Sequence, residues 1–252
     1  MKRREFTAAA VSAAAWGQGL FQSAQAQVAK PEAGADYLVL DKKTAVEAPA
    51  GKVEVVEFFW YNCPHCNAFE PTLESWIKRV PKDVQVRRVP VGFRDDFVPQ
   101  QRLYYTLEAM DLVDKLHAKV FAAIHAEKQQ LSRGDAIADW VAKQGVDKAR
   151  FLEQYNSFSV ATKASKATQL QNAYRVEGVP AMGVAGRFYT DGTLAKNMPR
   201  ALQIVDFQEA VFEVVELRFH ADSQGGRRMG IPGILADPAP DPRFIAARRR
   251  CG

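Results

Sequence analysis

Residues 53–66 read VEVVEFFWYNCPHC and set the architecture of the chain. The first part of this stretch, residues 53–60, is β-branched and aromatic, which predicts a buried strand. A helix is expected directly after it, because Pro64 suits the first helical turn, where no intrahelical N–H bond is lost. Apolar residues then recur at helical spacing until Pro81, which is expected to end the helix. The stretch therefore predicts a strand, a short connection and a helix that begins at the two cysteines.

The two cysteines, Cys63 and Cys66, lie on either side of Pro64 and His65. Cys63 is expected at the helix N-terminus, where free N–H groups and the helix dipole favour an anion. The imidazole of His65 further favours the charged form of the sulfur. Cys66 lies one turn later and is expected to be more buried. A stabilised thiolate at Cys63 makes the dithiol the preferred state, so the pattern predicts an oxidising disulfide.

Three other interpretations of the motif are a c-type haem attachment site, a zinc half-site and a static structural disulfide. Haem attachment needs His directly after the second Cys, where this chain has Asn67. Zinc needs two further ligands, and there is no second Cys pair. His117 and His125 lie in an amphipathic helical pattern instead. Redox chemistry is therefore favoured.

The N-terminus predicts export. Lysine and arginine at residues 2–4 precede an alanine-rich stretch and the small-x-small pattern of residues 24–26, which is typical of a signal peptidase site. We expect a signal peptide over 1–26 and a mature chain from Gln27. A membrane anchor is disfavoured because Gly and Gln interrupt the apolar run. Arg3-Arg4 also resembles a twin-arginine core, which gives a hypothesis for the export route.

The net charge of +5 and pI of about 9.1 arise at the two ends of the chain. Residues 1–26 and 219–252 carry formal charges of +2 and +3, so residues 27–218 are formally neutral. The basic pI is therefore no argument for a nucleic-acid partner. Residues 219–252 are rich in Gly, Pro and Arg, which predicts a disordered tail with Cys251 as an incidental thiol.

The remaining sequence alternates between strand and helix patterns. Residues 84–91 alternate like a strand, and residues 99–174 are helical in pattern. Strands are expected again at 181–184 and 187–190, with Ala185-Gly186 as a hairpin turn. A last helix is expected over 199–218. The pattern predicts one compact α/β domain over 27–218 with an all-helical insertion.

Within the insertion, apolar residues from Leu103 to Ile124 mark one long stripe. Ser132 and Asp135 resemble a capping box before a second helix, which Gly145 is expected to stop. Asp147 is expected to cap a third helix, and a fourth is expected over 160–174.

The dipeptide Val179-Pro180 stands at the entrance of a predicted strand. Proline cannot donate to a strand ladder, so its position calls for an explanation. A cis bond gives one, although an ordinary trans turn is commoner, since about 5–6% of X–Pro bonds are cis. The dipeptide alone leaves the two conformations open.

Taken together, the strand, the Cys63-Pro64-His65-Cys66 motif, the helical insertion and Val179-Pro180 resemble the DsbA family of thioredoxin-fold oxidases. The resemblance spans about residues 37–207. It implies an α/β thioredoxin fold with an inserted all-helical subdomain. It also implies that Cys63 is the exposed nucleophile and Cys66 the resolving thiol.

The resemblance further implies that Pro180 is a cis proline beside the disulfide, with Val179 offering backbone hydrogen bonds to a client strand. Glu57 matches the position of the family's buried acid, which helps move the proton of Cys66. The alternative interpretation of Glu57 is a charged side chain at the strand end that faces water. Arg88, on the neighbouring strand, is the expected partner of a buried Glu57.

The resulting hypothesis is a periplasmic dithiol oxidase that acts on reduced, newly exported proteins. The resemblance implies reoxidation by a DsbB-type membrane quinone reductase, no metal or organic cofactor, and a monomer. Trp60 and Tyr61 are candidates for an apolar client platform or for half-buried packing.

One rival function is disulfide isomerase or reductase. Such isomerases are typically dimers with a separate N-terminal domain, for which too few residues separate Gln27 from Cys63. A second rival is a non-catalytic chaperone with a static disulfide.

Overall fold

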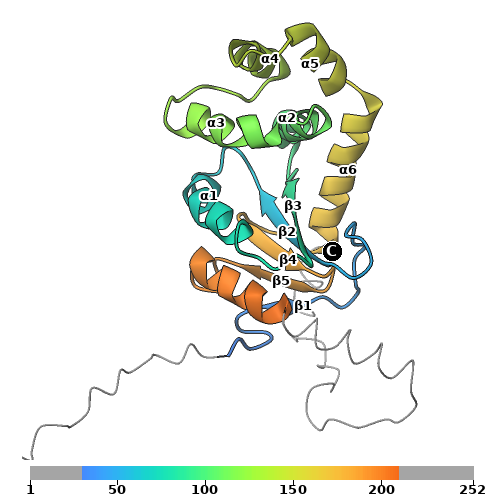
Figure 1. The fold of residues 1–252 in the computed structure, drawn as a ribbon, viewed down its shortest axis with the longest axis vertical. Helices are drawn as coiled ribbons and strands as arrows, with labels where there is room; N and C mark the ends of the chain where they lie inside the picture. Colours follow the sequence, from blue (N-terminus) through green and yellow to red (C-terminus); the bar gives the residue numbers. More distant parts are fainter. Residues whose placement is uncertain (1–29, 210–252) are drawn as a thin grey trace, which may run out of the picture. The chain divides into compact units, whose positions relative to one another are not determined.

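The computed structural model describes residues 30–209 (Figure 1). The predictions of a signal peptide over 1–26, a mature start at Gln27, a disordered tail over 219–252 and an incidental Cys251 therefore lie outside the described residues. None of the helices within the described range has the length and apolar character needed to cross a bilayer.

A five-stranded mixed sheet forms the centre of the described part, in the order β1-β5-β4-β2-β3. Its strands are β1 (Leu38–Val39), β2 (Val53–Phe59), β3 (Val84–Pro90), β4 (Ala181–Val184) and β5 (Phe188–Asp191). Strands β2 and β3 are parallel, whereas β2–β4, β4–β5 and β1–β5 are antiparallel. The β2–β3 pair requires a crossover, and helix α1 (Pro64–Ile77) provides it.

Strand β2 is buried along its whole length because both faces of the sheet are covered. Val55 packs with α1 and with the helical residues 198–209, whereas the next residue, Val56, packs on the opposite face with the helical insertion. Successive side chains of a strand point to opposite faces, so a continuous apolar run is what this position requires. The prediction of a buried strand here is confirmed.

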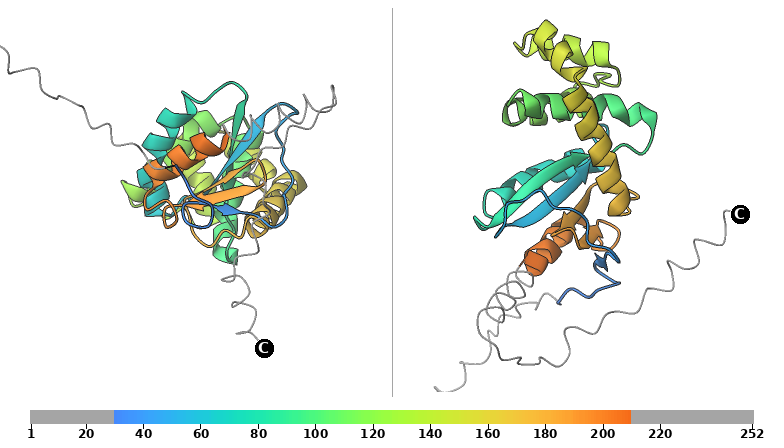
Figure 2. Two further views of the ribbon diagram at one scale, coloured as in Figure 1. Left: turned by 90° about the horizontal axis from the view of Figure 1, so that it is seen from below. Right: turned by 90° about the vertical axis from the view of Figure 1, so that its right-hand side faces the viewer.

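Five α-helices follow β3 before the chain returns to the sheet (Figure 1). They are α2 (Val98–Ala109), α3 (Val113–His125), α4 (Gly134–Lys143), α5 (Lys148–Tyr155) and α6 (Phe158–Ala173), and a short 3-10 turn, Asp95–Phe97, precedes α2. Helix α6 extends from the insertion back to the sheet, contacting both α2 and β3 (Figures 1 and 2). The expected thioredoxin-type α/β fold with a helical insertion is confirmed.

Two local predictions inside the insertion are wrong. The stripe from Leu103 to Ile124 is divided between α2 and α3, because the backbone turns at Asp111, whose φ is 56°. The Ser132–Asp135 capping box does not form, since Arg133 is the N-cap residue of α4 and makes no side-chain cap bond. The Asp135 carboxylate instead accepts from the N–H of Ala136, over 2.9 Å.

Other boundaries agree with the sequence prediction. Gly145, with φ of +83°, follows the end of α4, and the carboxylate of Asp147 caps α5 by accepting from Arg150 N. Helix α1 ends at Ile77, earlier than expected from Pro81, because residues 78–80 form hydrogen-bonded turns.

The hairpin between β4 and β5 turns at Ala185 and Gly186, both with positive φ, as a two-residue turn of this hand requires. After β5, residues 198–209 are helical, so only the first part of the helix predicted over 199–218 falls within the described range. Asn197 caps this helix by accepting from Arg200 N over 2.8 Å.

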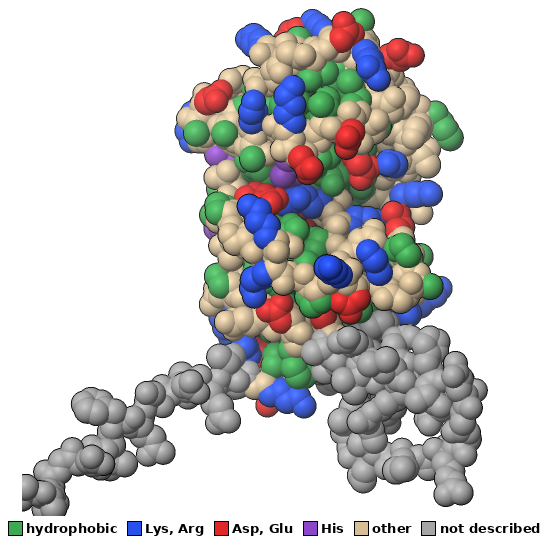
Figure 3. Space-filling view, in the orientation of Figure 1, with side chains coloured by type: hydrophobic (Ala, Val, Ile, Leu, Met, Phe, Trp, Pro, Cys, Tyr) green, Lys and Arg blue, Asp and Glu red, His purple; other side chains and the backbone are tan. Residues whose placement is uncertain are grey.

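The surface charge fits the neutral balance of the central sequence. On the face seen in Figure 3, cationic and anionic side chains are interspersed over the described residues rather than separated by sign.

Candidate active site

Cys63 is the N-cap residue of α1. Its backbone is extended, with φ −77° and ψ 117°, and its Sγ accepts a hydrogen bond from the N–H of Cys66 over 3.4 Å. Pro64 occupies the first turn, where its missing N–H removes no helical bond. The sulfur thus takes the place that a Ser or Asp oxygen occupies at other helix starts.

The two sulfurs lie in different surroundings. Both thiols are free, and Cys63 is 8% exposed whereas Cys66 is fully buried. Pro64 and His65, between them, are exposed. The prediction that Cys66 is the more buried thiol is confirmed. The expectation that Cys63 is exposed is wrong, because the Cys63 side chain is itself buried and only the more accessible of the two.

The proton affinities of the two thiols differ strongly. The hydrogen bond with the Cys66 side chain is the main cause that lowers the pKa of Cys63 to about 6, against the opposing effect of burial, and the backbone N–H of Cys66 lowers it further. The backbone N–H of His65 and then the charge of its imidazole lower this pKa further. Burial is the main cause that raises the pKa of Cys66, followed by its hydrogen bond with Cys63. Near neutral pH the negative charge therefore resides on Cys63.

The Val179–Pro180 peptide bond is cis, and the loop that contains it lies against the cysteines. The Cys63 thiol donates to the carbonyl oxygen of Val179, with 3.3 Å between sulfur and oxygen. Pro180 is buried, and Val179 is partly exposed. This loop borders the more accessible of the two sulfurs.

Glu57 lies inside the protein, on β2. Its side chain is fully buried, and its Oε2 accepts from Arg88 Nε over 3.1 Å. The other oxygen, Oε1, has no hydrogen-bond partner among the described residues. Burial is the main cause that raises the pKa of Glu57 to about 8. The alternative of a strand-end charge facing water is wrong, and the predicted contact with Arg88 is confirmed.

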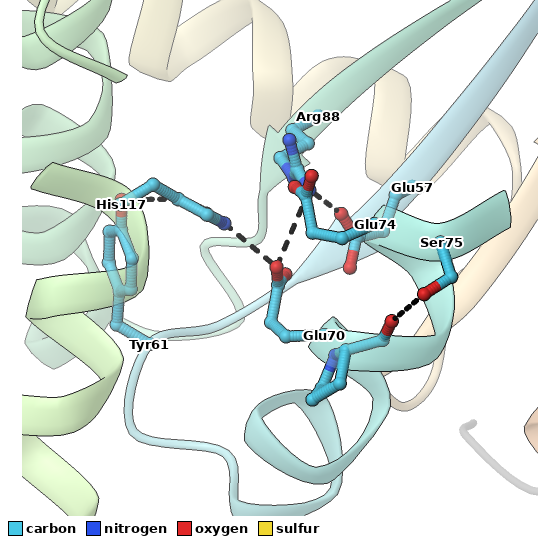
Figure 4. Close-up of polar contacts among 8 residues, drawn as sticks. Glu57, Tyr61, Glu70, Glu74, Ser75, Arg88 and His117 are labelled. Carbon is cyan, nitrogen blue, oxygen red and sulfur yellow. Dashed lines mark hydrogen bonds and ion pairs between the residues drawn. The ribbon is translucent and has the colours of Figure 1, made fainter. Parts of the chain in front are cut away.

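Arg88 also contacts two carboxylates of α1 that the sequence analysis missed (Figure 4). Its Nη2 lies 3.4 Å from Glu70 Oε2 and also donates to Glu74 Oε1. Glu70 follows Cys66 by four residues, and Glu74 follows Glu70 by four, so the three share one face of α1. This four-residue spacing is the sequence signal from which Glu70 and Glu74 could have been predicted to lie on the face of α1 that carries Cys66.

The insertion reaches this cluster through His117 of α3 (Figure 4). His117 Nε2 lies 3.2 Å from Glu70 Oε1, and His117 Nδ1 lies 2.8 Å from the hydroxyl of Tyr61. No local pattern connects α3 to α1, so this contact was not predictable from spacing. His125, nearby on α3, bonds the backbone oxygen of Tyr61 over 2.7 Å.

The residues before Cys63 pack differently from the predicted apolar platform. Tyr61 is fully buried, so it is excluded from such a surface. Trp60 is partly exposed and stacks on Phe97, with 4.0 Å between ring centroids. Half-buried packing therefore describes Trp60.

With one sulfur acidified and its neighbour held protonated, the pair is suited to exchanging disulfides with other thiols. The sheet, with its crossover helix and antiparallel hairpin, is that of thioredoxin. Together they define the class of thioredoxin-fold thiol:disulfide oxidoreductases.

Comparison with known proteins narrows this class. Residues 54–203 match the family model of the DSBA-like thioredoxin domain. The chain is 44% identical to the thiol:disulfide interchange protein DsbA of Burkholderia cepacia, over 73% of this chain and 87% of the relative. It is 43% identical to the protein of that name from Bordetella parapertussis, over 82% and 96%. The crystal structure of Pseudomonas aeruginosa DsbA superposes with a TM-score of 0.70 at 39% identity, over 74% of this chain and 96% of that one. The chain belongs to the DsbA family.

Proposed function

We propose that this protein is a periplasmic dithiol oxidase that donates a Cys63–Cys66 disulfide to reduced, newly exported proteins. The observation that carries the proposal is the lowered pKa of Cys63, about 6, which the hydrogen bond with the Cys66 side chain chiefly produces. A thiolate stabilised in this way is a good leaving group, and it stabilises the reduced enzyme relative to the disulfide. A disulfide whose reduced form is favoured oxidises other thiols.

The exchange begins when a client thiolate attacks the sulfur of Cys63. The Cys63–Cys66 bond breaks, its electron pair moves to the sulfur of Cys66, and a mixed disulfide joins the client to Cys63. The second thiolate of the client then attacks the client sulfur in this bond. The client leaves with its own disulfide, and Cys63 leaves as a thiolate.

The remaining site residues support these steps. Pro64 starts the helix that stabilises the thiolate, and His65 adds backbone and side-chain stabilisation. Val179 and Pro180 are proposed to hold an extended client segment beside Cys63. Glu57 is proposed to give its proton to Cys66, because a buried thiolate is unfavourable there and Glu57 is protonated at neutral pH.

The same proposal includes the compartment in which the protein works and the partner that reoxidises it. The signal peptide over 1–26 directs the chain to the periplasm, where it works as a monomer. A DsbB-type membrane quinone reductase accepts the two electrons of the dithiol and restores the disulfide.

The decisive experiment is equilibration of the purified protein with glutathione buffers, followed by quantification of the oxidised fraction. We expect a midpoint above the about −180 mV of protein disulfide isomerase and toward the about −120 mV known for DsbA. A midpoint near the about −270 mV of thioredoxin would instead indicate a reductase. A bond that resists reduction below about −300 mV would indicate a scaffold with a static disulfide.

A further inference from the structure

Glu70 joins the redox centre to the helical insertion. It lies on α1, is 8% exposed, and follows the resolving Cys66 by one helical turn. One of its oxygens contacts His117 of α3 over 3.2 Å, and the other contacts Arg88 of β3 over 3.4 Å. Three separate elements therefore meet at one buried carboxylate (Figure 4).

The direction of the hydrogen bonds follows from the proton affinities of the partners. Burial raises the pKa of Tyr61, so its hydroxyl keeps its proton and donates to His117 Nδ1. Burial also lowers the pKa of His117, which leaves a neutral ring whose Nε2–H donates to Glu70. Burial alone raises the pKa of Glu70, but the hydrogen bond of His117 and the charge of Arg88 outweigh it and lower that pKa. Glu70 is therefore a carboxylate.

The surroundings of Glu57 explain which acid of the cluster holds a proton. The titratable and charged groups with which it interacts are Arg88 on β3, Glu70, Glu74 and Cys66 on α1, Tyr104 on α2, and Tyr61 before Cys63, with His117 of α3 reaching it through Glu70. Glu57, Glu70 and Glu74 share the single cation Arg88. Of the three, Glu57 is the most buried, and this burial is the main reason that it keeps its proton. Like-charge repulsion from Glu70 is the second reason.

We propose that Glu70 and His117 are positioning residues for the Glu57–Arg88 pair, so that the helical insertion controls how Glu57 delivers its proton to Cys66. The inference deepens the proposed function and rests on it. When the client attacks Cys63, the electron pair of the broken disulfide goes to the Cys66 sulfur. The proton of Glu57 follows to that sulfur, and Glu57 remains as a carboxylate paired with Arg88. During reoxidation Cys66 returns the proton to Glu57 as its sulfur forms the new disulfide.

The first test replaces the charge of Glu70 while keeping its shape, as Glu70→Gln. Without the neighbouring negative charge, Glu57 releases its proton at lower pH. We expect the midpoint of its titration, followed by carboxylate ¹³C NMR in the oxidised protein, to fall by one unit or more from about 8. In the pH profile of client oxidation, the decline on the alkaline side is expected to move to lower pH together with the Glu57 midpoint. At pH 7 a one-unit fall reduces the protonated fraction of Glu57 from about nine-tenths to about one half, so the rate is expected to drop about twofold.

The matched control is Glu74→Gln. Glu74 contacts the same Arg88 nitrogen from the same helix, but its side chain is 45% exposed. Water screens an exposed charge, so the shift in the Glu57 midpoint is expected to be much smaller than with Glu70→Gln. Equal shifts in the two variants would overturn the role assigned to Glu70.

A second pair of variants tests the link to the insertion. His117→Phe keeps an aromatic ring among Phe59, Tyr104 and Phe121 but removes the donor to Glu70. Glu70 then takes up a proton more readily, and the Glu57 midpoint is expected to fall as in Glu70→Gln. His117→Gln retains an N–H at a similar reach, so it is expected to restore the midpoint and the rate profile. This pair also decides the proposal if Glu70→Gln does not fold.

Absorbance titration of Cys63 separates this proposal from the function on which it rests. None of the causes that lower the pKa of Cys63 involves Glu70 or His117, so its midpoint is expected to stay at about 6 in every variant. Active variants with an unchanged Glu57 midpoint, or with a shifted midpoint and an unchanged rate profile, would overturn the proposal and leave the oxidase standing. A wild-type protein that does not oxidise thiols would refute the oxidase itself, whatever Glu57 does.

Discussion

Cys63 combines two roles that are usually separate, because one sulfur both caps a helix and serves as the proposed nucleophile. The N–H of Cys66 donates to it over 3.4 Å, so the bond that starts α1 also stabilises the thiolate. The capping position was predictable from the sequence, since a proline favours the first turn of a helix and the cysteine before Pro64 is then expected at the helix start. The helix start and the redox centre are therefore one local structure.

The roles of the two cysteines are tested by removing each in turn. In Cys63→Ala, the more accessible of the two sulfurs is lost, and oxidation of a reduced test protein is expected to fall to the uncatalysed rate. In Cys66→Ala, the Cys63 thiolate can still attack a disulfide of an oxidised test protein, but no Cys66 thiol is present to displace the client. Mixed disulfides with Cys63 are therefore expected to accumulate on non-reducing gels. Turnover by Cys63→Ala above the uncatalysed rate would contradict the assignment.

The stability of the reduced protein is expected to depend on pH through Cys63. Its pKa is about 6 when folded, mainly because of the hydrogen bond with the Cys66 side chain, and 9.0 is the reference value for the unfolded chain. The folded state thus gains stability that is fully present above pH 9 and is lost as pH falls to 6. Denaturant unfolding of reduced wild-type protein and Cys63→Ala gives the comparison.

The difference in unfolding free energy between these two proteins is expected to grow from pH 6 to pH 9. Its slope stays below the limit of about 1.4 kcal/mol per pH unit, because the folded and unfolded states differ by less than one bound proton at this single thiol. The comparison with Cys63→Ala cancels the opposite contribution of Glu57, whose pKa is raised by burial. A constant difference would show that Cys63 titrates normally.

At the scale of elements, the sequence predicts best where local chemistry determines the backbone. Strand β2, the start of α1 and the turn at Ala185-Gly186 each depend on neighbouring residues, and all three were predicted. The division between α2 and α3 at Asp111 was missed, because residues 110–112 contain no Gly or Pro to mark it. Tertiary packing of the two helices overrides the continuous apolar stripe.

The buried cluster around Arg88 illustrates the other limit of prediction. Glu57 was placed by the family resemblance, and Arg88 by its position on the adjacent strand. His117 comes from a helix in the insertion and meets Glu70 only in the folded chain. Residues that converge from separate elements have no spacing rule, so the positioning part of the site became visible only in the structure.

For the whole molecule, the proposed function requires export, and the twin-arginine hypothesis makes the route testable. Replacing both Arg3 and Arg4 with Lys retains the charge but removes the pair that the twin-arginine route recognises. We expect the protein to accumulate inside the cell as a precursor, measured by fractionation and intact mass. A control with Lys2→Arg should be exported normally. Unimpaired export of the double variant would refute this route and leave an ordinary secretory signal.

Under the docking role proposed for Val179, its contact with Cys63 connects the acidity of that thiol to client capture. The carbonyl oxygen of Val179 is engaged only when the sulfur carries a hydrogen. Both the disulfide and the thiolate lack that hydrogen, so in each of them this oxygen is open to the N–H of an incoming chain. Below about pH 6 the Cys63 thiol of the reduced enzyme is protonated and occupies the Val179 oxygen that is proposed to bind the client. Mild acid therefore blocks this oxygen in the reduced enzyme, whereas in the disulfide form the oxygen stays open to a client.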